Sequence, residues 1–400
     1  MTTTSSSEVY FDPYDVEINA DPYPIYQRLR DEAPIYHNET YDFWVLSRHA
    51  DIKEALVNWK TFTSTRSDIL DIIRADFDLP DGVIMFEDPP THTSHRGLMS
   101  RVFTPRRMAA LEDQVRKYCI DCLDPLVGAS GFDVIDELAK TLPMKVISML
   151  LGIPERDQVA VRNKTDNNLR TEPGKPMDIE EDQIASGAMF EEYIDWRMKH
   201  PSDDLMTQLL TAEFEDTDGT TRTLTRQEVS TYTAVLAGAG NETTGRLIGW
   251  LIKVLAEHPD QRRMVHDDRS LLPKVIDETL RFEPTGHASA RYVTEDVEYY
   301  GTTVPAGSAM LLSMASANRD PRYYDRPDVF DITRADTTHL TFGYGLHFCL
   351  GASLARLEGS VALDEMLNRW PEWDIDDDGI SLFPTSTVRG WEHMPITIPG

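Results

Sequence analysis

Glycines and a histidine surround one cysteine near the C-terminal end of the chain. The segment reads Phe342-Gly-Tyr-Gly-Leu-His-Phe-Cys349-Leu-Gly351, and a helical pattern follows it. Glycines let the backbone turn tightly and approach a flat macrocycle, while backbone N–H groups at the start of the next helix can hold a thiolate. A thiolate donates electron density to haem iron and favours cleavage of an O–O bond. The spacing therefore predicts Cys349 as an axial haem ligand rather than a buried structural cysteine.

A second group of reactive side chains lies inside a long segment with helical periodicity, in Ala239-Gly-Asn-Glu242-Thr243-Thr244. Glycine and consecutive hydroxyl residues are unfavourable inside a helix and indicate a local bend, which would open space beside a ligand. An acid next to an alcohol suits stepwise delivery of protons to an oxygen atom. We therefore expect Glu242 and Thr243 to be catalytic. The alternative is a solvated glutamate and a threonine at the edge of the core.

The cysteine segment resembles the signature of the cytochrome P-450 family, Phe-Gly-x-Gly-x-His-x-Cys-x-Gly, and every fixed position is present. The resemblance extends over most of the chain and implies haem b (iron protoporphyrin IX) as the cofactor. It matches Thr243 to the oxygen-side threonine of the family and Glu242 to the neighbouring acid. It also implies that the haem is contacted by Ala239, Gly240, Phe342, Gly343, His347 and Gly351.

Haem carries two propionates, which need cationic hydrogen-bond donors. His92 and Arg96 follow Asp88-Pro-Pro90, Arg291 lies further along the chain, and His347 lies in the cysteine segment. All four match propionate-binding positions of the family. Without that match, His92 and Arg96 would equally fit a solvated helix face.

Glu278 and Arg281 lie three residues apart, so they can pair on one helix face. Such a pair alone is weak evidence, because exposed pairs of this kind are common. The resemblance implies that Arg334 completes a buried Glu-Arg-Arg cluster. We assign these three residues to fold integrity rather than to chemistry.

Mostly apolar residues occupy the stretches that line the substrate pocket in the family. Oily walls with a few polar groups suit a lipophilic small molecule, although the residue types do not choose which one. The expected lining consists of Ile84, Met85, Phe86, the segment 165–190, Leu236, Ala239, His287 to Ala290, and Thr387 with Val388.

The chain has no GxGxxG after a strand and no room for a flavin or nicotinamide domain, so we expect electrons from a ferredoxin and a ferredoxin reductase. In the fold of the family, several arginines would gather on the face nearest the cysteine and form a docking patch for an acidic ferredoxin. These are Arg96, Arg101, Arg106, Arg107 and Arg356.

The hydrophobic pattern predicts a mostly α protein with small β-sheets. Helices are expected at 23–29, 51–56, over most of 95–285, and from 349 to about 370, with loops at 152–154, 172–174 and 216–219. Strands are expected at 43–46, 296–300 and 310–313. Thr225 and Glu228 fit a capping box for a helix of about thirty residues that ends at His258-Pro259. The resemblance implies a triangular fold with the haem between this helix and the cysteine segment.

Bulk composition excludes several classes of function. The 68 Asp and Glu residues against 39 Lys and Arg give a formal net charge of −29, which disfavours nucleic-acid binding. The chain contains no run of about 18 apolar residues and no basic leader, so we expect a cytoplasmic monomer without a membrane contact. Cys119 and Cys122 lack the second ligand pair of a zinc site; we expect reduced helix cysteines and leave a redox role open.

No linker or repeat divides the sequence, so we expect one domain over residues 1–400, in which the polar start allows about the first ten residues to be disordered. The predicted function is a monooxygenase that inserts one atom of O₂ into a lipophilic molecule, by C–H hydroxylation or epoxidation. Two alternatives stay open. One is a haem-thiolate isomerase or peroxygenase, which the Glu242-Thr243 pair disfavours. The other is a haem-based ligand sensor, for which an effector domain is lacking.

Overall fold

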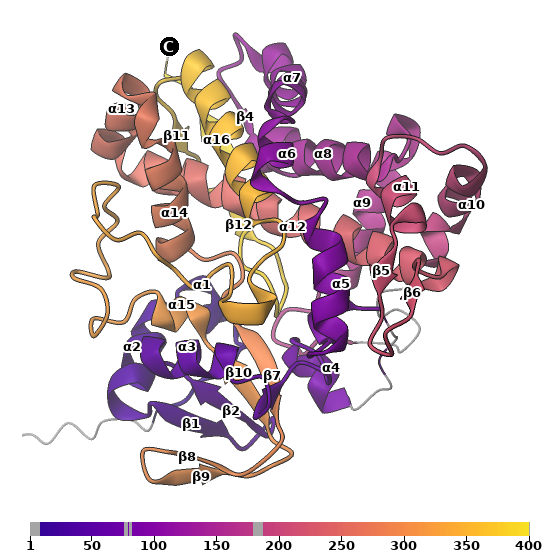
Figure 1. Cartoon of the computed structure of the whole chain (residues 1–400). Coiled ribbons are helices and arrows are strands. Elements are labelled where there is room, and N and C mark those ends of the chain that lie inside the picture. Colours follow the sequence, from indigo (N-terminus) through magenta and orange to yellow (C-terminus); the bar gives the residue numbers. More distant parts are fainter. Residues whose placement is uncertain (1–8, 76–78, 80–81, 179–186, 400) are drawn as a thin grey trace, which may run out of the picture.

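Helices form most of the protein, and small sheets lie at its edges (Figure 1). The structure is a computed structural model that describes residues 9–75, 79, 82–178 and 187–399. The predicted fold class, mostly α with small sheets, is confirmed. Residues 1–8, which carry most of the expected N-terminal disorder, and residues 179–186 of the expected pocket lining lie outside the described residues.

The longest described helix is α12 (Arg226–Glu257), and the signals at both of its ends are where the sequence predicts them. The Thr225 side chain accepts a hydrogen bond from the Glu228 amide, and the Glu228 carboxylate accepts one from the Thr225 amide. At the other end, α13 (Pro259–Asp267) begins directly after His258. The helix continues unbroken through residues 239–244, so the bend expected there does not interrupt it.

Other helices surround α12 and bury most of its length. Glycine in a helix interior lowers stability by about 0.5–1 kcal/mol relative to alanine. Close packing explains why two glycines of α12 are nevertheless present. A Cβ at Gly245 would lie 2.6 Å from the Ala139 carbonyl oxygen, and one at Gly249 would lie 2.9 Å from Ile135 Cδ1. The helices that contact α12 include the π-helical segment η3 (Ile135–Ala139), α8 (Thr141–Leu151), α9 (Glu155–Leu169), α10 (Glu191–Lys199), α11 (Leu205–Thr211), α14 (Leu272–Phe282) and α16 (Ala352–Arg369).

The largest sheet has the strand order β1-β2-β10-β7-β3 and lies beside the N-terminal helices (Figure 1). Its β2–β10 pair is parallel and its other pairs are antiparallel. This sheet confirms the strand predicted at 43–46 and shifts the one predicted at 310–313 by one residue. The strands are β1 (Ile35–Asn38), β2 (Phe43–Leu46), β3 (Phe62–Thr63), β7 (Ser289–Val293) and β10 (Ala309–Leu312).

The smaller sheets are hairpins and one three-stranded sheet of order β11-β14-β4. The strand predicted at 296–300 is β8 of a hairpin, and the loop predicted at 216–219 is the turn between β5 and β6. These strands are β4 (Gly131–Asp133), β5 (Phe214–Glu215), β6 (Thr221–Arg222), β8 (Val297–Tyr299), β9 (Thr302–Val304), β11 (Asp374–Ile375), β12 (Ser381–Leu382), β13 (Trp391–His393) and β14 (Pro395–Thr397).

Two predicted boundaries differ from the structure. The last long helix, α16, begins at Ala352 and not at Cys349, because the cysteine backbone still belongs to the preceding loop. Strand β4 interrupts the stretch expected to be helical, because its residues pair with β14 from the end of the chain. The remaining helices are α1 (Val16–Ala20), α2 (Tyr23–Glu32), α3 (His49–Val57), α4 (Leu70–Ala75), η1 (Ile84–Phe86), α5 (Thr91–Ser100), α6 (Pro105–Ala109), α7 (Glu112–Leu123), η2 (Asp124–Leu126), η5 (Ala188–Phe190), η6 (Arg269–Leu271), α15 (Met314–Ala317) and η7 (Gly345–His347).

Candidate active site

The cysteine loop folds back on itself just before α16. Gly343 and Gly345 adopt φ values of 71° and 73°, a left-handed conformation that side chains rarely allow. The Cys349 amide donates to the Phe342 carbonyl oxygen at 2.7 Å. Gly351 is the N-cap residue of α16. Cys349 thus lies at the N-terminal end of a helix, as the sequence predicts.

The groups around Cys349 have opposite effects on the pKa of its thiol. Burial raises the pKa of the thiol, whereas the Gly351 and Ala352 amides and the guanidinium groups of Arg96 and Arg356 favour the thiolate. The Arg356 guanidinium lies 4.7 Å from the centre of the Phe342 ring. Burial dominates in the protein alone, and a bound cation would reverse the balance, because a coordinating thiol is deprotonated.

Glu242 and Thr243 do not hydrogen-bond to each other. Glu242 is buried and forms an ion pair with Arg246, one helical turn further along α12. The Thr243 hydroxyl donates to the Ala239 carbonyl at 2.8 Å. A Cβ at Gly240 would lie 3.0 Å from Ile147 Cδ1, so the small size of this residue serves the packing of α8 on α12.

His92 on α5 and His347 in the cysteine loop lie together, with ring centroids 4.4 Å apart. Both ring nitrogens of His92 are buried without a hydrogen-bond partner among the described residues, whereas Nε2 of His347 lies 3.9 Å from Asp88 Oδ1, beyond hydrogen-bond distance. Burial, with help from the charges of His347 and Arg96, lowers the pKa of His92 to about 4, so this imidazole is neutral at pH 7. Unpaired buried nitrogens are rare and costly, and they indicate an absent acceptor.

The two arginines of the predicted propionate set differ from each other. Arg291 on β7 is buried and donates to the Ser289 hydroxyl at 2.7 Å and to the Ala290 carbonyl. Burial lowers its pKa, while Asp68 and Asp88 raise it, so its charge faces the region beside His347. Arg96 instead donates to the Phe348 carbonyl and braces the cysteine loop. This contact uses one of the five N–H donors of arginine, so the expectation that Arg96 also takes a propionate stays a prediction.

Glu278, Arg281 and Arg334 form one buried cluster. Arg281 makes two hydrogen bonds of 2.8 Å to the Glu278 carboxylate, and Arg334 Nε lies 3.4 Å from it. Arg281 also donates to the carbonyls of Asn318 and Pro327. The cluster therefore ties α14 to the long loop that leads to the cysteine.

The predicted pocket residues Ile84, Met85, Phe86, Leu236 and Val388 are apolar and buried or half-buried. Ile84 and Phe86 in η1 are buried, and Met85 is half-buried. Phe86 and Met85 belong to a cluster that includes Val235 of α12, whose neighbour Leu236 is half-buried. Val388 is also buried.

His287 is one of the polar members of the pocket set. It is buried, and its Nδ1 lies 3.5 Å from the Tyr26 hydroxyl. Burial lowers its pKa to about 4, and the Arg389 charge adds to this effect. His287 is therefore a neutral side chain at pH 7.

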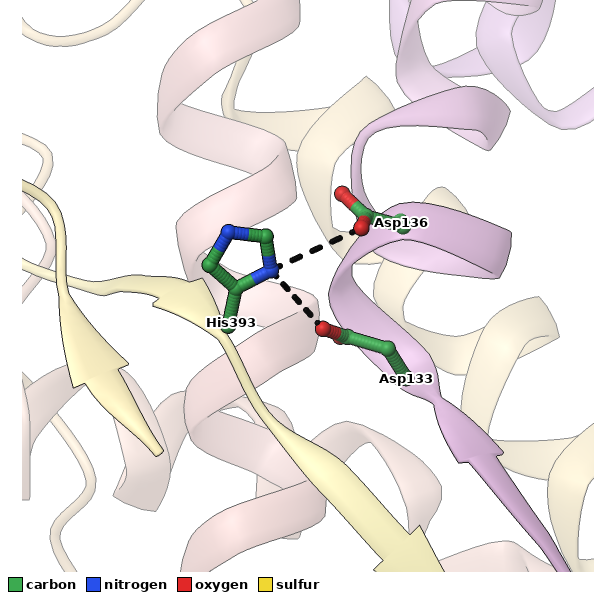
Figure 2. A group of neighbouring side chains, drawn as sticks. All are labelled: Asp133, Asp136 and His393. Atoms are coloured by element: carbon green, nitrogen blue, oxygen red, sulfur yellow. Dashed lines mark hydrogen bonds and ion pairs between the residues drawn. The ribbon is translucent and has the colours of Figure 1, made fainter. Parts of the chain in front are cut away.

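One cluster that the sequence does not reveal joins Asp133, Asp136 and His393 (Figure 2). His393 Nδ1 lies 3.0 Å from Asp133 Oδ2 and 3.5 Å from Asp136 Oδ2. Lys140 donates to Asp136, and Asp133 also accepts from the Ile135 and Met394 amides. These partners account for the cluster as a tether between the β4 region and the C-terminal segment. The residues come from distant parts of the chain, so no local pattern could predict it.

Arg246 is the second feature missed by sequence reasoning. The i, i+4 spacing from Glu242 could have suggested the pair, but its burial depends on the C-terminal segment packed over it.

Comparisons with known proteins agree with this geometry. The sequence model of the cytochrome P-450 family matches residues 180–383. A Mycobacterium tuberculosis protein provisionally named cytochrome P-450 123 is 38% identical, over 98% of this chain and 97% of that protein. The vitamin D(3) 25-hydroxylase of Pseudonocardia autotrophica is 34% identical, over 100% of this chain and 98% of that protein.

Solved structures show the same fold. The Bacillus megaterium protein CYP109E1 in complex with testosterone superposes with a TM-score of 0.85 at 29% identity, covering 96% of this chain and 99% of that one. A mutant of the protein EryK in complex with erythromycin B has a TM-score of 0.85 at 30% identity, covering 95% and 97%. The chain belongs to the cytochrome P-450 family.

Membership of this family defines the chemistry in general terms. The protein is a cytochrome P-450 monooxygenase with haem b as its cofactor, and it uses O₂, a lipophilic substrate and redox partners. The residues fit that cofactor, because a cysteine at a helix start faces amide groups while buried imidazole nitrogens lack acceptors that two propionates would supply. No helix among the described residues is long and apolar enough to cross a membrane.

Proposed function

We propose that this chain oxidises a bulky lipophilic molecule, inserting one atom of O₂ into a C–H bond or across a double bond, with electrons from a ferredoxin and its reductase. The observation that carries the assignment of the site is that the buried His92 ring, whose two nitrogens lack a hydrogen-bond partner among the described residues, lies against His347 of the same loop that carries Cys349 to the start of α16. When bound, haem b supplies the iron at which O₂ is activated.

Each group of residues has a role in this proposal. Cys349 Sγ would ligate the haem iron, and the Gly351 and Ala352 amides would hold it as a thiolate. His92, Arg96, Arg291 and His347 would donate to the propionates, and Arg96 also holds the loop through the Phe348 carbonyl. Phe342, Gly343 and Ala239 border the macrocycle. Glu242 passes a proton to the Thr243 hydroxyl, and this hydroxyl directs the proton toward the reacting oxygen.

The substrate class follows from the apolar types of the proposed pocket residues Ile84, Phe86 and Val388, of which Phe86 packs in one cluster with Val235 of α12. An apolar pocket binds lipophilic molecules by burial and uses few polar groups for orientation. The name of one relative specifies vitamin D(3), and two structural neighbours hold testosterone and erythromycin B. Large polycyclic or macrocyclic lipids are therefore the first compounds to screen.

Exposed positive charge indicates where an acidic redox partner would dock. Arg101, Arg106 and Arg107 are exposed, and α6, which carries two of them, packs on α16 directly after the cysteine loop. Arg356 is instead paired with Asp277 at 2.8 Å, and Arg96 with the loop backbone. The docking surface for an acidic ferredoxin thus consists of Arg101, Arg106 and Arg107. We also infer that the chain acts as a single domain, because one helix, α12, contacts elements from both halves. That it acts as a monomer is a further part of the proposal.

The deciding experiment is the carbon monoxide difference spectrum of the dithionite-reduced protein. A red-shifted Soret band of the thiolate type is expected for the parent chain and for Cys119→Ser, because Cys119 lies in the core of α7. Cys349→Ser should lose this band. A thiolate band that survives Cys349→Ser would refute the ligand assignment. Substrate turnover without a reductant would favour the isomerase or peroxygenase alternative.

A further inference from the structure

Arg246 connects Glu242 to the C-terminal part of the chain. Its side chain is buried, and one end of its guanidinium group pairs with the Glu242 carboxylate. The other end donates to the Trp391 carbonyl at the start of β13. The same group lies 4.1 Å from the centre of the Phe383 ring. One guanidinium therefore joins a proposed proton donor to a distant hairpin.

The hairpin, which we define as residues 381–393, fits closely around this side chain. Phe383 N–H donates to the Gly390 carbonyl at 2.9 Å, and Trp250 Nε1 of α12 donates to the Arg389 carbonyl at 3.0 Å. A Cβ at Gly390 would lie 2.3 Å from Arg246 Cδ. Glycine is thus required at position 390 for Arg246 to keep its place.

Val388 lies in the same hairpin, two residues before Gly390, and belongs to the proposed pocket wall. Consecutive residues of a helix point about 100° apart, and the Thr243 hydroxyl is already bonded to the Ala239 carbonyl. In this arrangement the Glu242 carboxylate has to leave Arg246 before it can reach Thr243.

We propose that Arg246 is a positioning residue that couples the hairpin to Glu242. The hairpin fixes the Arg246 guanidinium, and the guanidinium holds the Glu242 carboxylate away from Thr243. A molecule that displaces the loop at Val388 loosens this hold and lets Glu242 turn to Thr243. This inference rests on the proposed function, and it makes proton delivery depend on occupancy of the pocket.

The residue type supports the coupling. Arginine offers a planar fork that can bind a carboxylate and a carbonyl together, whereas the ammonium group of lysine is a single point charge. Arg246→Lys should therefore keep the ion pair or the Trp391 contact, but not both. Arg246→Gln should lose the ion pair.

The test uses the haem-loaded protein with carbon monoxide as the probe of the distal side, read as the C–O stretching band. Arg246→Gln and Gly390→Ala should each add a second, shifted band, because a released Glu242 approaches the bound probe. In a Glu242→Gln background, Gly390→Ala should add no band. Arg170→Gln is the matched control, because Arg170 packs on the same Phe383 ring at 4.6 Å and pairs with Glu392.

A second measurement follows the coupling in the reverse direction, since coupling between two sites is reciprocal. Glu242→Gln should speed hydrogen exchange at the Phe383 amide about tenfold, roughly the factor for one lost charge-assisted hydrogen bond. Arg246→Lys provides a milder variant if Arg246→Gln does not fold. Unchanged C–O bands in Gly390→Ala and Arg246→Lys, or a Gly390→Ala band that persists without Glu242, would overturn the inference. Loss of the thiolate-type spectrum in the parent chain would instead refute the proposed function.

Discussion

At the scale of single residues, burial decides which side chains of the site carry charge. His92 and His287 are both neutral at pH 7, because burial lowers the pKa of each to about 4. A neutral imidazole can donate to a propionate through one nitrogen and still accept through the other. Arg291 stays charged beside the acids Asp68 and Asp88. The polar part of the site therefore combines arginine cations with neutral imidazoles.

The neutral state of His287 predicts how stability depends on pH. An unfolded histidine has a pKa of about 6.5, so the unfolded chain binds a proton below pH 6.5 while folded His287 stays neutral down to about pH 4. Its contribution is thus complete above pH 6.5 and is lost as the pH falls toward 4. Between pH 7 and pH 5 the loss should be about 2 kcal/mol.

Urea unfolding at pH 7 and pH 5 measures this effect. His287→Gln cannot take up the proton, so its free energy of unfolding should fall less than that of the parent. His266→Gln, at an exposed position on α13, should follow the parent. If the free energy of unfolding fell equally between pH 7 and pH 5 in the parent and in His287→Gln, the lowered pKa of His287 would be contradicted.

At the scale of elements, a buried ion cluster fixes the long segment that leads to the cysteine loop. The Glu278, Arg281 and Arg334 cluster joins α14 to the loop region, and Arg281 also donates to carbonyls on the path toward the cysteine. Asp331 N–H donates to Glu278 at 2.9 Å. This long segment has little regular structure, so buried charge pairs replace strand or helix hydrogen bonds in fixing it.

Removal of one partner from this cluster leaves a buried unpaired charge. Glu278→Ala should lower the free energy of unfolding by about 3–5 kcal/mol and give little protein that retains haem. The measurement is haem content per folded chain together with urea unfolding. Glu257→Ala is the control, since it breaks a half-exposed pair with Lys253 that contributes about 0–1 kcal/mol. Normal haem loading in Glu278→Ala would show that the cluster is dispensable.

At the scale of the whole molecule, a chain with a net charge of −29 repels acidic partners over most of its surface. The exposed arginines at positions 101, 106 and 107 are a local exception beside α16. Such a patch on an acidic protein can select the orientation of a docking partner and raise its association rate.

Reversal of one charge in the patch tests this orientation. Arg107→Glu should slow reduction by an acidic [2Fe–2S] ferredoxin about tenfold at low salt, and the difference from the parent should shrink as salt screens the charges. The measurement is stopped-flow reduction at increasing ionic strength. Arg263→Glu, an exposed change on α13, should behave as the parent. An equal slowing by both variants would mean that net charge matters and the patch does not.

Local signals were sufficient for much of this protein. The spacing around Cys349 predicts a haem ligand because glycine conformations and a helix start are properties of neighbouring residues. The capping box at Thr225 and the stop at Pro259 define α12 for the same reason. The strand β4 was not predictable, because its partner β14 lies near the other end of the chain. The start of α16 was placed too early, because the Cys349 amide bonds to the Phe342 carbonyl within the loop.

Only the tertiary structure decided how the charged side chains pair. Arg96 donates to the Phe348 carbonyl and Arg356 pairs with Asp277, two contacts that the sequence did not predict. Glu242 pairs with Arg246 because residues 383–391 cover that part of α12 and exclude water from it. An ion pair in the interior depends on which distant segments remove the solvent, and a local pattern holds no information about those segments.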